Sequence, residues 1–101
     1  METPHLKYLK YLDLSTAHIT KEDSEMLSDH DECHRGGLVV YDYEYGFFIP
    51  VCDELDGVQI RQAGFSDALA YIVELCQEQK IDLIRLDCDG EEIEGLPTFE
   101  W

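Results

Sequence analysis

The chain has 101 residues and 45% of them are hydrophobic, which suits one folded domain over residues 1–101 and is too apolar for a disordered acidic tail. Its 23 aspartates and glutamates stand against 7 lysines and arginines, giving a formal net charge of −16. Such a surface repels nucleic acid and anionic membranes and attracts basic proteins. We therefore expect neither direct nucleic-acid binding nor membrane binding.

The sequence also lacks the signals of export. No apolar run reaches the ~18–20 residues of a membrane span, and the first residues have neither the basic nor the apolar region of a signal peptide. The four cysteines are scattered, and three of them lie within apolar runs, where a free thiol behaves as a small core residue. These features predict a reduced, cytoplasmic protein.

The N-terminal part predicts a strand and then a short helix. Residues 6–14 fit either a strand or a helix by periodicity, and we favour a strand over residues 11–14 because apolar and polar side chains alternate there. Thr20 with Asp23 comes close to a capping box, in which each residue satisfies the backbone of the other. This pattern predicts a short helix that begins after Thr20 and ends near Ser28 or Asp29.

Residues 38–51 predict a β-hairpin around which the rest of the chain is arranged. Two runs of β-branched and aromatic residues flank a short polar centre. Gly46, after Tyr45, is expected to adopt a positive φ and so to let the chain turn. Pro50 lacks an amide hydrogen, which predicts that the second strand lies at a sheet edge or ends there.

The next part predicts a loop followed by the longest helix. Residues 53–63 are expected to form a loop with a turn at Asp56–Gly57. Ser66 is a typical N-cap, and apolar residues then recur at steps of three and four along residues 69–76. The helix is expected to end over residues 77–80.

The C-terminal part predicts a second hairpin. Residues 81–88 have the alternation of a strand, Asp89–Gly90 is a strong hairpin turn, and residues 91–94 would form the returning strand. Trp101 is expected to pack down onto the fold. The whole order predicts an α+β fold, with a mostly antiparallel sheet of about five strands and two helices on one face.

One polar loop contains the residue types of a metal or thiol site. His30, Cys33 and His34 lie close together, but a zinc site needs a second pair of ligands, and the other cysteines fall in predicted core positions. Cys33 beside His34 also suggests a thiol enzyme, and Ser15–Thr16 near His18 suggests a hydroxyl nucleophile, although neighbours on an extended chain point apart. We keep a small metal-dependent or thiol module at Cys33–His34 as the alternative function. Our main expectation is a protein that is not an enzyme and binds no metal or cofactor.

The acidic residues form the main candidate site. Acids alternate along predicted strands, where residues two apart share a face at about 6.6–6.8 Å, close to the roughly 6–7 Å between successive phosphates of a nucleic-acid strand. Neighbouring tyrosines suit a protein interface, while the alternative is a solvated acidic face without a partner. We expect one outward-facing panel made of Asp42, Glu44, Asp87, Asp89, Glu91, Glu92 and Glu94.

A resemblance to a known family rests on four segments, Leu12–Ile19, Val39–Phe48, Leu86–Gly90 and Gly95–Trp101. They are similar to a family of small acidic proteins of unknown function carried on plasmids, integrative elements and phages. The resemblance implies a mobile genetic element, where such proteins blunt restriction or CRISPR systems, and it brings no catalytic residue. We therefore expect an inhibitor of a basic nucleic-acid-binding host defence protein, either anti-CRISPR or anti-restriction, and in its sharpest form a DNA mimic.

Overall fold

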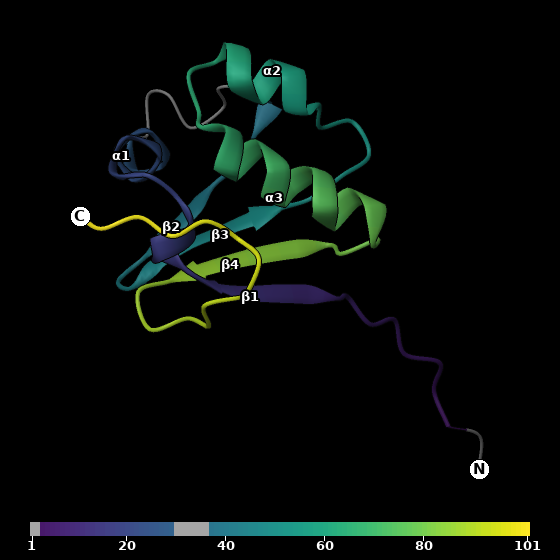
Figure 1. The fold of residues 1–101 in the computed structure, drawn as a ribbon. Helices are drawn as coiled ribbons and strands as arrows, with labels where there is room; N and C mark the ends of the chain where they lie inside the picture. The colour runs from purple at the N-terminus through teal and green to yellow at the C-terminus, as the bar shows by residue number, and fades with distance from the viewer. Residues whose placement is uncertain (1–2, 30–36) are drawn as a thin grey trace.

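The sheet is built from strands of both halves of the chain. The computed structural model describes residues 3–29 and 37–101 (Figure 1). Its strands run in the order β1–β4–β3–β2, with β1 parallel to β4 and the other neighbours antiparallel. The elements in chain order are β1 (Tyr11–Ser15), the 3-10 helix η1 (Thr16–His18), α1 (Lys21–Ser28), β2 (Tyr41–Tyr43), β3 (Gly46–Pro50), α2 (Gly57–Gln62), α3 (Asp67–Glu78) and β4 (Leu83–Asp87).

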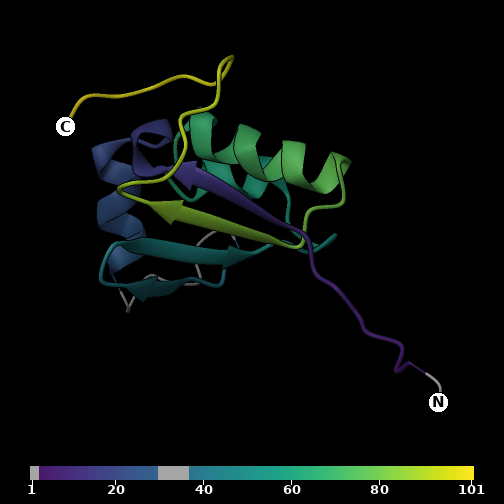
Figure 2. The same ribbon diagram turned by 90° about the horizontal axis from the view of Figure 1, so that it is seen from below.

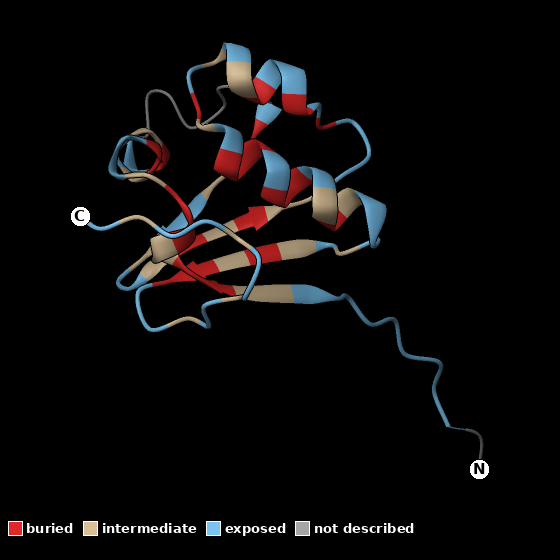
Figure 3. Cartoon of the chain, viewed as in Figure 1, coloured by how far each residue is buried: buried red, intermediate tan, exposed pale blue. Residues whose placement is uncertain are grey.

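The predicted α+β class is confirmed, although the described part of the chain has four strands and three α-helices. Both α2 and α3 lie over one face of the sheet, and α1 stands near the end where β1 and β4 finish (Figure 1, Figure 2). Buried residues lie on the sides of the two layers that face each other (Figure 3). The sheet contributes Leu14, Ile49, Ile84 and Leu86 to this core, and α3 contributes Leu69, Ile72, Val73 and Cys76. Among the described residues, every helix is too short or too polar to span a lipid bilayer.

The hairpin predicted over residues 38–51 is confirmed, but Gly46 is needed for a different reason. Strands β2 and β3 pair antiparallel, and Pro50 is the last residue of β3. Gly46 is not among the glycines with positive φ. A Cβ at this position would lie 1.7 Å from the carbonyl oxygen of Leu86 in β4. The close approach of two strands, rather than a left-handed turn, therefore requires glycine here.

The predicted return strand over residues 91–94 is wrong. β4 already pairs with β1 on one side and with β3 on the other, so neither of its edges is open to a hairpin partner. The chain instead passes across the end of β1, where the Ser15 N–H donates to the Glu91 carbonyl at 2.9 Å. Gly90 allows this crossing, because a Cβ there would lie 2.2 Å from the Leu14 carbonyl oxygen.

The loop predicted over residues 53–63 is also wrong, because it contains α2. Asp56 acts as the N-cap of this helix and accepts a hydrogen bond from the Val58 N–H at 2.8 Å. Ile60 is fully buried, and Arg61 pairs with Glu74 of α3 at 2.9 Å. Packing against α3 thus stabilises a helix that is too short to be stable alone.

The two predicted N-caps are confirmed, and a single buried carboxylate joins them. Thr20 and Asp23 form the capping box of α1, and the Ser66 hydroxyl accepts from the Leu69 N–H in α3. Asp23 is 1% exposed and also accepts hydrogen bonds from the N–H and hydroxyl of Ser66. This carboxylate therefore fixes the start of α1 against the start of α3.

Candidate protein-binding surface

Two turns lie side by side at one end of the sheet. The turn between β2 and β3, residues 44–45, meets the turn after β4, residues 88–89, because the Cys88 N–H donates to the Tyr45 carbonyl at 2.9 Å. Directly after the second turn, the chain crosses the end of β1 at Gly90 and Glu91. We call the region made of residues 42–45 and 88–92 the turn end.

The turn end gathers five of the seven predicted contact residues, namely Asp42, Glu44, Asp89, Glu91 and Glu92, all of them exposed. Only Asp42 lies in a strand, so the predicted strand spacing of about 6.6–6.8 Å does not describe this group and is wrong. Glu94 lies elsewhere, in a groove beside α3. Asp87 lies in β4 and is only 5% exposed.

Asp87 belongs to the structure of the sheet and not to its exposed surface. Its carboxylate accepts from the Tyr43 hydroxyl, from the Asp89 N–H at 2.8 Å and from Arg85 Nη2 at 3.0 Å. These contacts, with the Tyr43 hydrogen bond the strongest influence, hold the pKa of Asp87 below its ordinary value. Burial raises the pKa of Tyr43, so its hydroxyl stays protonated and keeps donating. The network ties β2 to β4 immediately below the turn end.

His18 fixes the segment that carries the last acids, a role that the sequence did not reveal. It is fully buried, its Nε2 accepts from the Ile93 N–H at 2.8 Å, and its Nδ1 lies 2.7 Å from the Pro97 carbonyl oxygen. Because a carbonyl can only accept, Nδ1 carries the proton and the ring is neutral. Both ring nitrogens are thus engaged, which leaves none to activate the Ser15 hydroxyl, itself the cap of η1.

Two aromatic side chains lie beside the acids. Trp101 donates its indole N–H to the Ile19 carbonyl at 3.0 Å, which holds the C-terminus against the fold. The predicted packing of Trp101 is therefore confirmed only in part, because its ring is 55% exposed. With Tyr45, Asp42 and Glu44 it lines a shallow depression of about 310 Å³. Exposed tyrosine and tryptophan rings are enriched at protein interfaces, and the acids around them would lie at the polar rim.

Comparison with protein families gives one match. Residues 11–101 match the C-terminal domain of DUF5983, a family of unknown function. The chain belongs to this family. The predicted resemblance to a family of unknown function is therefore confirmed at that level. Searches of the curated proteins and of the solved structures found no similar protein.

The remaining candidate chemistry does not form a site in the described residues. Asp87, Cys88 and Asp89 bring ligand atoms within 4.8 Å of one another, but both oxygens of Asp87 already accept hydrogen bonds. Burial raises the pKa of the Cys76 thiol to about 11, which makes it a poor nucleophile. The candidate loop with His30, Cys33 and His34 lies outside the described residues.

Proposed function

We propose that this domain binds a basic surface of a nucleic-acid-handling protein through its turn end and thereby inhibits that protein. The observation that carries the proposal is the gathering of exposed acids from separate segments. Glu44, Asp89, Glu91 and Glu92 come from two turns and the following chain, and none forms an ion pair with another described residue. Their charge is therefore available to a partner.

The two arginines that the structure describes do little to cancel this charge. Arg61 is paired with Asp67 and Glu74 in the helical layer, and Arg85 is paired with Asp87 within the sheet. A surface with a strongly negative field attracts a basic partner from a distance and competes with the phosphates that the partner normally binds. Trp101 and Tyr45 would supply apolar contact area at the centre of such an interface.

The sharper form of the proposal places the domain on a plasmid, integrative element or phage, acting in the cytoplasm as an anti-CRISPR or anti-restriction protein. Nucleic-acid channels of such host proteins are positively charged, which suits an acidic competitor. Association should be fast at low salt and slow as salt rises, because screening shortens the range of the attraction.

The test reverses charge at the turn end in the full chain. We expect a triple variant, Glu44→Lys, Asp89→Lys and Glu92→Lys, to lose inhibition of DNA cleavage by a restriction or CRISPR nuclease that the native domain inhibits. A matched control reverses three exposed acids at the opposite end of the sheet and in α3, Asp53, Glu54 and Glu78, with the same change in net charge. Loss in the first variant alone supports the turn end as the site. Equal loss of inhibition in both variants would show that net charge alone causes the effect and that the turn end is not the site. Full inhibition by the first variant would refute the proposal.

A further inference from the structure

The N-terminal arm, residues 3–10, exposes apolar side chains that nothing in the described chain covers. It continues from β1 away from the body of the domain (Figure 1). Leu6 is 58%, Tyr8 80% and Leu9 64% exposed. The arm also carries Lys7 and Lys10 and no acid, whereas all 23 aspartates and glutamates except Glu2 lie in residues 11–101.

The strand that follows the arm is an open edge of the sheet. The Lys10 carbonyl accepts from the Leu83 N–H of β4 at 3.2 Å, so the backbone of alternate residues from Lys10 onward faces β4. The backbone groups of Tyr11 and Asp13 therefore face the other way, toward the free edge. Farther along, Ser15 already donates to Glu91, which limits the open stretch to the start of β1.

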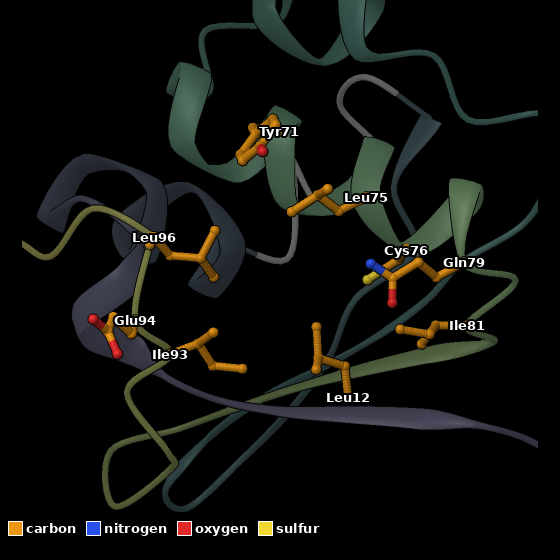
Figure 4. A pocket seen from close by; sticks show the side chains of 10 residues that line it. Leu12, Tyr71, Leu75, Cys76, Gln79, Ile81, Ile93, Glu94 and Leu96 are labelled. Atoms are coloured by element: carbon orange, nitrogen blue, oxygen red, sulfur yellow. The ribbon is translucent and has the colours of Figure 1, made fainter.

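An apolar groove of about 360 Å³ lies next to this edge on the helical side of the sheet. Leu12 of β1 forms its floor, Tyr71 and Leu75 of α3 line one wall, and Ile93 and Leu96 line the other (Figure 4). Along an extended chain, Leu6 and Tyr8 share a face with Leu12. The arm of a second chain paired to this edge would thus direct apolar side chains toward the groove.

We propose that two copies of this chain form a dimer by pairing β1 and the arm antiparallel across a two-fold axis at Lys10. In this register Lys7 lies opposite Asp13 of the second copy, and Leu9 lies opposite Tyr11. Tyr8 lies opposite Leu12 and enters the groove of the second copy. Shifting the register by one two-residue step would place His5 or Leu9, rather than a lysine, opposite Asp13.

The charged side chains along the free edge of β1 favour a second copy of this chain as the partner that binds there. Asp13 Oδ1 is buried and has no hydrogen-bond partner among the described residues, and Arg85 Nε lies 3.9 Å from it. A lysine on the neighbouring strand would satisfy this carboxylate, whose side chain is 41% exposed. The two Lys10 side chains meet at the axis, where their like charges are unfavourable. Each Asp82 carboxylate, which accepts from the backbone N–H of Lys10 at 2.9 Å, places a negative charge beside them.

Mass measurement by light scattering with charge-swapped variants tests the dimer. We expect the native protein to have a mass in solution of twice the 11.7 kDa of a single chain. Lys7→Glu and Asp13→Lys should each weaken dimerisation about tenfold or more, because symmetry repeats the change twice, and combining them should restore it. Lys21→Glu, with the same charge change on α1, should leave the dimer intact. A native chain that stays monomeric, or a folded double variant that does not recover, would overturn the proposal.

A cross-link gives an independent reading if Asp13→Lys does not fold. In a background with Cys33→Ser, Cys52→Ser and Cys88→Ser, Lys10→Cys should form an interchain disulfide under mild oxidation, because opposed residues of a non-hydrogen-bonded pair have Cα atoms about 4.5 Å apart. Leu9→Cys should not, since the two Leu9 residues are offset by two positions in this register. Cross-linking of both variants to the same extent, or of neither, contradicts the pairing.

Discussion

Replacing His18 by leucine should release the C-terminal segment without emptying the core. Leucine keeps most of the buried apolar volume but removes both hydrogen bonds, to the Ile93 N–H and the Pro97 carbonyl. Two neutral hydrogen bonds contribute about 1 kcal/mol each, and a buried N–H left without an acceptor costs about 1–3 kcal/mol. If the C-terminal segment detaches, the Ile93 N–H can bond to water, but the segment then loses its packing against the rest of the domain. We therefore expect a loss of about 2–4 kcal/mol of unfolding free energy.

Urea unfolding followed by circular dichroism measures this loss, and amide exchange locates it. The Ile93 and Phe99 amides should lose protection first, because Phe99 donates to the Ala17 carbonyl at 2.8 Å within the same segment. His5→Leu in the exposed arm is the control and should change stability by less than about 0.5 kcal/mol. A variant as stable as the native chain, with both amides still protected, would show that His18 does not hold the segment.

Three further predictions follow from the structure. Asp23→Ala should cost about 3–5 kcal/mol in urea unfolding, because it leaves the Ser66 N–H and the start of α1 without their charged acceptor, and a loss below about 1 kcal/mol would contradict this role. Asp87 has a folded pKa below its ordinary 3.8, so it stabilises the fold above that pH, and this stabilisation is lost as the pH falls through the lowered value. Tyr43→Phe removes the main cause of the lowered pKa and should therefore flatten the fall of the thermal midpoint below pH 4. An unchanged slope would refute this role of Tyr43. Cys76 should resist iodoacetamide in the native state, as peptide mass spectrometry can show, and alkylation as fast as that of an exposed thiol would disprove its protection.

The elements that the sequence predicted correctly are those with local signals. Thr20 and Ser66 are caps whose partners lie within three residues, and the apolar repeat of α3 lies within one segment. α2 has no such repeat, since only two of its six residues, Val58 and Ile60, carry apolar side chains, and its Asp56 cap also fits a turn. Its helical state depends on burying Ile60 and on the contacts of Arg61 with α3, which no local pattern reveals.

The acids of the candidate site were predictable as exposed residues, but their arrangement was not. Parallel pairing of β1 with β4 fills the edge that a second hairpin would need, and this long-range pairing decides where residues 91–94 lie. Long-range contacts also explain why the sequence did not predict the structural roles of Asp87 and His18. Their hydrogen-bond partners lie 44 residues away at Tyr43 and 75 residues away at Ile93, beyond the reach of any spacing rule.

The acidic residues in and beside the turn end fall into two groups, those whose side chains stabilise the fold and those whose side chains do not. Its anchors are backbone hydrogen bonds, such as Cys88 to Tyr45, and the buried groups of Asp87 and His18. None of these anchors uses the side chain of Glu44 or Glu92. Clustering such side chains raises repulsion within the chain, and no described cation offsets it. Because these acids carry a structural cost and form no ion pair with the described residues, we propose that they serve binding, and charge reversal there should remove function and leave the fold intact.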